Sequence, residues 1–220
     1  MNAYEEVCQW EMTSAVDTLR KCGLHNAMLA MDLGCGLGHY TIPAAISVGS
    51  EGRVVAVDYD KKILKGTSQR LLDAGLSNVD ITCANHLELG HVPDSSIDFL
   101  MIYDMIHTNP RIEIFPVIKR LLKSGGTLSV LAFGEIKIQK NEYGQFIKSE
   151  IGKNITDPYR EALTKLHNEI QFYGFSLSSV VEGEGVHFDH FHSAYHWKKY
   201  GDVRLDSLER GDIYNFANEK

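Results

Sequence analysis

Short apolar runs alternate along this chain with longer stretches in which apolar residues recur every three or four positions. Uninterrupted apolar runs are typical of strands buried on both faces of a parallel sheet, and the longer periodic stretches are typical of amphipathic helices. Because the two kinds of segment alternate, the pattern predicts an α/β fold built on a parallel sheet. The strands are expected at residues 28–33, 52–58, 79–83, 97–103 and 127–133.

The helices and the C-terminal strands complete this picture. An N-terminal helix is expected over residues 3–21, with Gly23 at its end and an apolar stripe that contains Cys8, Met12, Ala15, Leu19 and Cys22. Further helices are expected at residues 39–47, 60–74, 114–121 and 157–173. Phe175 then opens a strand to about residue 181, a turn follows at residues 183–185, and the chain returns as a strand over residues 186–197.

The most informative stretch joins the first strand to the helix after it. It reads Asp32-Leu33-Gly34-Cys35-Gly36-Leu37-Gly38, with a glycine at every second position. Glycines allow a sharp turn and let the backbone approach a ligand without a Cβ in the way, and the following helix directs its first amides toward the same space. The pattern predicts a nucleotide-binding turn, with a ligand-free strand–helix turn as the alternative. The candidate residues are Asp32, Gly34, Cys35, Gly36 and Gly38.

The spacing of this turn separates two classes of nucleotide. A dinucleotide fingerprint of the form G-x-G-x-x-G needs a small residue at its last position. Starting at Gly34 that position is His39, and starting at Gly36 it is Thr41; neither allows the usual close contact between helix and strand. An NAD-dependent oxidoreductase is therefore disfavoured.

A second acid ends the next expected strand. Asp58 lies 20 residues after Gly38, where a carboxylate can accept hydrogen bonds from both hydroxyls of a ribose. The ordinary role of an acid in this place is to cap the following helix, but Asp60 already provides that cap. Asp58 is therefore predicted to bind a ribose, and the ring of Tyr59 can lie against an adenine face.

Four motifs in this order resemble the class I S-adenosylmethionine-dependent methyltransferases. The first two are the D-x-G-x-G-x-G turn and the acid at Asp58. The third is Pro-Asp-Ser-Ser-Ile-Asp-Phe at residues 93–99, before the fourth strand, and the fourth is Leu-Lys-Ser-Gly-Gly at residues 122–126, where Ser124 replaces the family's usual proline. The resemblance covers about residues 28–134 and is strongest to the small-molecule group that includes ubiquinone and menaquinone C-methyltransferases. It implies S-adenosylmethionine as cofactor and a Rossmann-like, doubly wound sheet of seven strands, mostly parallel with a C-terminal antiparallel hairpin.

The resemblance also implies roles at later strand ends. Where the family commonly has an acid that holds the adenine amino group, this chain has Asn85, whose carbonyl can do the same, followed by His86. Ligands of open α/β sheets lie at the carboxyl ends of strands beside the switch point. Tyr103 is therefore expected near the cofactor, and Asp104 and His107 are the candidates for a catalytic base. An imidazole can accept a proton from the acceptor at neutral pH, although orienting its loop is an equal alternative for His107.

Composition and charge limit the classes of partner that the protein is expected to bind. A net charge of −7 and a pI near 5.8 argue against a nucleic-acid-binding protein, and a small-molecule substrate is expected instead. No run reaches the apolar length of a membrane span, no signal-peptide pattern opens the chain, and the four cysteines form no C-x-x-C pair. These features favour a reducing cytoplasm. The 220 residues are expected to form one domain over residues 1–220, and a homodimer is the candidate assembly.

Two readings from other classes compete with a small-molecule methyltransferase. One is a sensor or partner subunit that keeps the cofactor site without transferring a methyl group, and the other is the disfavoured oxidoreductase. Within the domain we expect an N-terminal helix at residues 1–23, a candidate substrate lid at residues 134–156 and a polar C-terminal tail at residues 198–220. The sequence identifies neither the acceptor nor the atom that is methylated.

A run of late histidines resembles a metal site in composition. On a strand, His190, His192 and His196 share one face, but His196 lies about 13 Å from His192, too far for a common ion. Methyl transfer from a sulfonium also needs no metal. We therefore expect no metal site, and instead a strand with Tyr195 and Trp197 toward the core and the histidines near solvent or the substrate.

Overall fold

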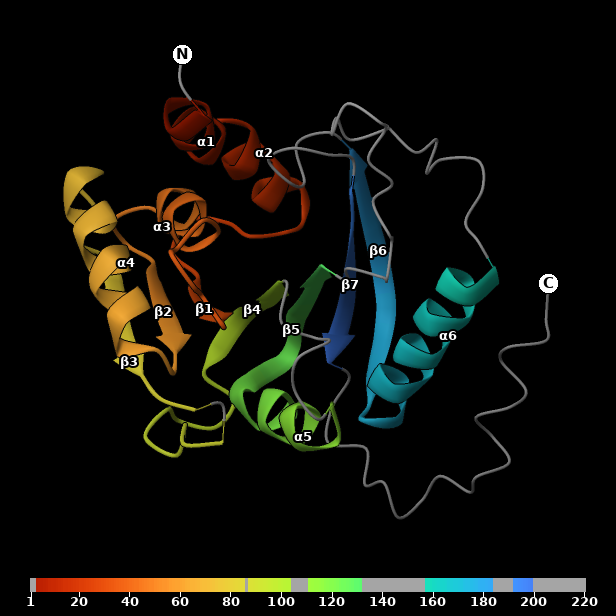
Figure 1. The fold of residues 1–220 in the computed structure, drawn as a ribbon. Coiled ribbons are helices and arrows are strands. Elements are labelled where there is room, and N and C mark those ends of the chain that lie inside the picture. Colours follow the sequence, from red (N-terminus) through yellow and green to blue (C-terminus); the bar gives the residue numbers. More distant parts are fainter. Residues whose placement is uncertain (1–2, 86, 104–110, 132–156, 184–191, 200–220) are drawn as a thin grey trace.

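Seven strands form one mixed sheet in the computed structural model, which describes residues 3–85, 87–103, 111–131, 157–183 and 192–199 (Figure 1). Their order across the sheet is β3-β2-β1-β4-β5-β7-β6. Strands β1 to β5 pair in parallel, and β7 lies antiparallel between β5 and β6. The predicted fold class is therefore confirmed. The strands are β1 (Leu29–Leu33), β2 (Arg53–Asp58), β3 (Val79–Cys83), β4 (Ile97–Tyr103), β5 (Leu122–Leu131), β6 (Phe175–Gly183) and β7 (His192–Lys199).

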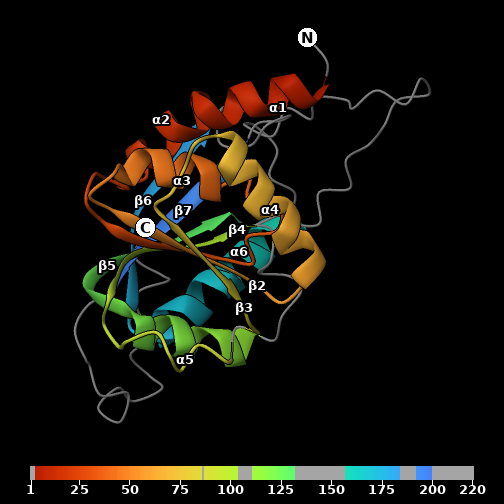
Figure 2. The ribbon, with the colours of Figure 1, turned by 90° about the vertical axis from the view of Figure 1, so that its left-hand side faces the viewer.

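Helices cover both faces of this sheet (Figure 2). One face carries α1 (Ala3–Met12), α2 (Ser14–Lys21), α3 (Thr41–Val48) and α4 (Lys61–Asp73), and the other carries α5 (Arg111–Leu121) and α6 (Asp157–Phe172). None of the helices in the described part of the chain is long and apolar enough to cross a bilayer.

The core consists of apolar layers on the two sides of the central strands. One layer packs α5 and α6 onto the sheet, with Phe115 and Ile170 buried among strand residues such as Leu100. The other packs α2 and α3 onto the opposite face around Phe99 and Leu19. Successive residues of β4 thus contact opposite layers, which explains why this strand is apolar at nearly every position.

The N-terminal helix differs from the expectation because it is broken at Thr13. This residue has φ −128° and ψ −86°, and its hydroxyl donates to the carbonyl of Gln9 at 2.6 Å. Such a bond from a Ser or Thr side chain to the preceding turn competes with the helix and bends it. The expected stripe shifts with the break: Met12 is exposed, whereas its neighbours Trp10 and Glu11 are buried.

The C-terminal half of the sheet also departs from the expected boundaries. β5 begins at Leu122, so that the glycine-containing segment 122–126 belongs to the strand, with a register shift opposite Ile97 and Phe99. β7 continues through Lys199, whose buried ammonium donates to the carbonyl of Leu122 at 2.7 Å. The polar tail therefore starts after the strand and not at residue 198, and the expected lid at residues 134–156 lies outside the described residues.

Candidate functional site

The glycine turn after β1 is anchored to the end of β2. The backbone N–H groups of Gly34 and Cys35 both donate to the carbonyl of Val57, at 2.8 and 2.9 Å, and Gly38 N donates to Cys35 O at 2.8 Å. Gly34, Gly36 and Gly38 have φ values of 82°, 50° and 81°. L side chains rarely adopt these values, so the alternating glycines are a requirement of this turn.

Gly36 and Gly38 face different surroundings. A Cβ at Gly38 would lie 2.9 Å from Cγ2 of Thr67 on α4, whereas a Cβ at Gly36 would meet no atom within 4 Å. Gly38 is thus needed for close packing against α4, and Gly36 borders open space. That space lies at the carboxyl end of β1, whose neighbours β2 and β4 mark the switch point of the sheet.

Asp58 joins this turn to the end of β2 through both oxygens of its carboxylate. Oδ2 accepts from Gly36 N at 3.0 Å, and Oδ1 accepts from Asp60 N at 2.9 Å. Asp60 is the helix cap, as predicted, because its Oδ1 accepts from Lys62 N and Ile63 N at 2.7 and 3.3 Å. The two neighbouring acids therefore have separate roles, and each Asp58 oxygen keeps a second lone pair for a further donor.

Asp32 and Cys35 belong to the turn but turn their side chains inward. The carboxylate of Asp32 is buried and accepts a 2.6 Å hydrogen bond from the Thr41 hydroxyl. Burial raises the pKa of Asp32 to about 6, although the Thr41 bond opposes the shift, and the nearby charge of Asp58 adds to it. Burial likewise raises the pKa of the Cys35 thiol, which therefore stays protonated at neutral pH.

The residues predicted to surround an adenine lie at the ends of β2 and β3. The ring of Tyr59 is 81% exposed and is accessible to a planar ligand. The Asn85 side chain forms a local turn, in which Oδ1 accepts from Leu87 N at 3.1 Å while Glu88 accepts from Asn85 N at 3.0 Å. The predicted acceptor atom of Asn85 is therefore shared with the backbone, and His86 lies outside the described residues.

Tyr103 ends β4 with its side chain buried. Its hydroxyl lies 2.6 Å from Oγ of Ser129, and its ring packs edge-on against Tyr40 with centroids 4.6 Å apart. Burial raises the pKa of this phenol well above its usual value. The contact of Tyr103 with a cofactor remains a prediction, and Asp104 and His107 lie outside the described residues.

His196 does not face solvent, so the expectation of a solvent-facing histidine was wrong for this residue; its proximity to the substrate stays a prediction. Its side chain is 1% exposed because β7 is an interior strand between β5 and β6. Nδ1 lies 3.3 Å from Oγ of Ser179, and within the described part of the chain Nε2 has no hydrogen-bond partner. Burial lowers the pKa of His196 to about 4. Trp197 is buried on the opposite face of the strand, as predicted.

The neutral His196 predicts an acid-sensitive fold. Its pKa is lower in the folded state than in the unfolded state, so its contribution is fully present above about pH 6.5 and is lost as the pH falls toward 4. Between pH 7 and 4.5, urea unfolding should show the wild type losing about 2–3 kcal/mol more free energy of unfolding than His196→Gln. The raised pKa of Asp32 makes the fold more stable as the pH falls, but Asp32 is present in both proteins, so its contribution cancels in the comparison. Equal losses would contradict a neutral, buried His196.

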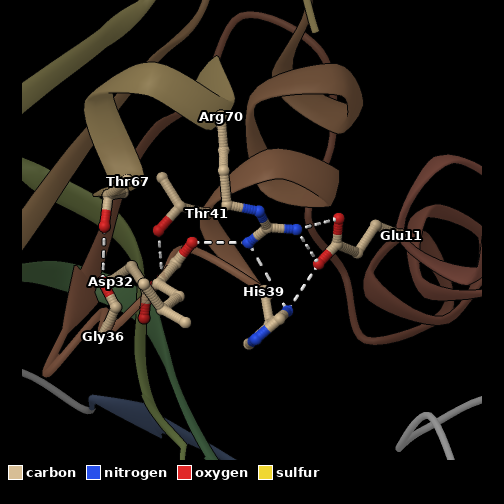
Figure 3. Close-up of polar contacts among 8 residues, drawn as sticks. Glu11, Asp32, Gly36, His39, Thr41, Thr67 and Arg70 are labelled. Carbon is tan, nitrogen blue, oxygen red and sulfur yellow. Dashed lines mark hydrogen bonds and ion pairs between the residues drawn. The ribbon is translucent and has the colours of Figure 1, made fainter. Parts of the chain in front are cut away.

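A group of polar residues beside the glycine turn was missed at the sequence level (Figure 3). Glu11 lies on α1, His39 directly follows the turn, and Thr67 and Arg70 lie on α4. These residues contact one another or the turn. Glu11 and Arg70 are 59 residues apart, and no local pattern marks them as partners. In the sequence, Glu11 is distinguished only by its place directly after Trp10 on the first predicted helix.

The metal prediction concerns residues that the structure covers only in part. His190 lies outside the described residues, and the described ones contain no group of three His, Cys, Asp or Glu side chains that could hold an ion. The absence of a metal stays a prediction.

The sequence pattern that defines the ubiE/COQ5 methyltransferase family matches residues 7–173 of this chain. The chain belongs to this family. The match begins in α1 and ends just after α6, so it includes the glycine turn, Asp58 and the strand ends described above. The protein is an S-adenosylmethionine-dependent methyltransferase of the small-molecule group, which confirms the resemblance found in the sequence.

Curated relatives agree with this family assignment, and a solved structure agrees with the fold. The demethylmenaquinone methyltransferase of Listeria welshimeri is 24% identical over 187 residues, which are 77% of this chain and 79% of that protein. The enzyme of the same name from Geobacillus stearothermophilus is 28% identical over 152 residues, 66% of this chain and 64% of that protein. In fold, the chain is similar to an S-adenosylmethionine-dependent methyltransferase from Aquifex aeolicus, with a TM-score of 0.64, 20% identity and coverage of 86% and 91% of the two chains.

Proposed function

We propose that this methyltransferase binds S-adenosylmethionine at the carboxyl ends of β1 to β3 and methylates a small ring compound of the quinol class. The observation that carries the proposal is the hydrogen bond from Gly36 N to Asp58 Oδ2 at 3.0 Å, beside the open space at Gly36. It joins the predicted backbone-contacting turn to the predicted ribose acceptor. The quinol class is supported by the relatives named demethylmenaquinone methyltransferases.

The described residues fit such a cofactor. The turn offers backbone without an obstructing Cβ at Gly36, Asp58 offers two acceptor oxygens, and the exposed ring of Tyr59 offers a flat apolar face. Bound S-adenosylmethionine supplies an activated methyl group, so the protein's main contribution is to hold the donor and the acceptor in line. If the acceptor must lose a proton, His107 and Asp104 are our candidates for the base.

Cys83 provides a test of where the cofactor binds. This exposed thiol ends β3 directly beside Asp58 in the sheet register, whereas Cys22 and Cys35 are buried. In a Cys8→Ser background, S-adenosylhomocysteine at about ten times its Kd should slow maleimide labelling of Cys83 about ten-fold, because the occupied site shields it. Mass spectrometry of the labelled peptide measures the rate. An unchanged rate at saturation would place the ligand elsewhere.

Turnover decides between an enzyme and a binding protein. Purified protein with S-adenosylmethionine and a short-chain demethylmenaquinol should yield a product that has gained one methylene in mass, and Asp58→Ala at the same cofactor concentration should yield much less. Tight cofactor binding without product from a panel of quinols and phenols would favour the sensor or partner-subunit reading. Binding of NAD in place of S-adenosylmethionine would contradict the proposal altogether.

A further inference from the structure

The buried carboxylate of Glu11 connects α1 to α4 and to the residue that follows the glycine turn. Glu11 is 1% exposed, and both of its oxygens lie 2.6 Å from Nη2 of Arg70 on α4. Oε1 also lies 2.6 Å from Nδ1 of His39, the residue directly after the glycine turn. Burial of a carboxylate is costly unless charged partners compensate it, so the three side chains form one unit. Figure 3 shows Arg70 reaching from α4 toward Glu11, with His39 below.

The same arginine holds the glycine turn. Its Nη1 donates to the carbonyl of Leu37 at 2.5 Å, between Gly36 and Gly38. One turn earlier on α4, the hydroxyl of Thr67 donates to the carbonyl of Gly36 at 2.6 Å. Residues three apart lie on the same face of a helix, so α4 binds two successive carbonyls of the turn from one side.

The backbone of α4 approaches the turn closely enough to make these contacts restrictive. A Cβ at Gly66 would lie 3.2 Å from Cδ2 of Leu37, and one at Gly38 would lie 2.9 Å from Cγ2 of Thr67. The turn therefore has little room on the α4 side. The bonds from Arg70 and Thr67 oppose a shift of the turn away from α4.

We infer that Arg70 and Glu11 are positioning residues for the cofactor, an inference that rests on the proposed function. Arg70 fixes the glycine turn in the conformation that binds the cofactor, and Glu11 fixes the guanidinium of Arg70 so that Nη1 meets Leu37 O. The affinity for the cofactor thus depends on Glu11 of the N-terminal helix, whose hydrogen bonds among the described residues reach the turn through Arg70 and His39. His39 adds a second link between Glu11 and the turn.

A merely structural role explains these contacts less well. An aromatic contact already holds α1 in place, because the ring of Trp10 packs edge-on against Tyr40, with ring centroids 5.6 Å apart. Buried ion pairs often add little net stability compared with apolar replacements. Orientation is what this pair supplies, because the 12% exposed Arg70 side chain serves a carboxylate and a turn carbonyl with different nitrogens. A lysine carries the same charge but lacks the planar fork that reaches both.

The test compares cofactor affinities in variants with matched chemistry. Arg70→Lys and Glu11→Gln should each weaken binding of S-adenosylhomocysteine about ten-fold or more in calorimetry, the effect of losing a charged hydrogen bond. Thr67→Val, which leaves α1 untouched, should shift affinity in the same direction by a smaller factor. The control is Arg53→Lys: Arg53 also forms a two-point pair, with Asp80 at 2.6 and 2.8 Å, but at the amino end of β2. Its affinity should equal that of the wild type.

Three readouts separate positioning from folding. Circular dichroism and thermal melting identify any variant that is unfolded at the binding temperature. If one charge variant fails to fold, the other still tests the inference, and Thr67→Val tests separately whether bonds from α4 fix the turn. In turnover assays, folded variants should show a higher KM for S-adenosylmethionine than the wild type, with kcat at saturation near the wild-type value. Folded variants that bind with unchanged affinity would overturn the inference. A wild-type protein that binds no S-adenosylhomocysteine would instead refute the proposed function.

Discussion

Gly36→Val should abolish the binding of S-adenosylmethionine while leaving the protein folded. A Cβ at Gly36 would meet no protein atom within 4 Å, so an added side chain would extend into the space assigned to the cofactor. The fold must tolerate only the strain of a branched residue at a φ of 50°, which costs on the order of 1–3 kcal/mol. Calorimetry should detect no heat of binding at cofactor concentrations that saturate the wild type.

Gly75 offers a control with the same backbone conformation. Its φ is 69°, a Cβ there would also meet nothing within 4 Å, and it lies beyond the C-terminal end of α4 rather than in the turn. Gly75→Val should therefore lose stability to a similar extent and bind the cofactor normally. If both variants bind normally, the cofactor does not use the space at Gly36; if both fail, strain and not steric exclusion is the cause.

The sequence predicted the strands and the turn well because these features depend on local chemistry. The alternating glycines are required by three positive φ values, and the apolar runs are required by strands that contact core layers on both faces. The different roles of Asp58 and Asp60 were also predictable, because one helix needs only one N-cap. Each of these inferences used residues within a few positions of one another.

The failures share a different cause, which is contact over long distances in the sequence. His196 was expected near solvent or the substrate. It is buried from solvent because β7 is an interior strand, and a strand pattern gives two faces but not the number of neighbouring strands. The pairing of Glu11 with Arg70 joins helices 59 residues apart, and neither helix shows it alone. The break at Thr13 is the exception, because its cause is local: the Thr13 hydroxyl donates to the carbonyl of Gln9, four residues earlier, and the apolar stripe of the predicted helix does not reveal this bond.

Asp58→Ala should weaken binding of S-adenosylhomocysteine about 10- to 150-fold, the equivalent of about 1.5–3 kcal/mol for hydrogen bonds to a charged group. The matched control is Asp60→Ala, which removes the helix cap two residues later. That variant should lose about 0.5–2 kcal/mol of stability and bind the cofactor as the wild type does. Chemical denaturation and calorimetry on the same samples measure both quantities.

The ribose role of Asp58 still has to be separated from its hold on the turn, because the same carboxylate accepts from Gly36 N and Asp60 N. A 2′-deoxy analogue of S-adenosylhomocysteine makes the separation through a double-mutant cycle. If Asp58 binds the ribose, removal of the 2′-hydroxyl should weaken binding to the wild type and have little further effect on Asp58→Ala. If the deoxy analogue loses the same factor in both proteins, Asp58 acts only by fixing Gly36, and the ribose must bind another residue.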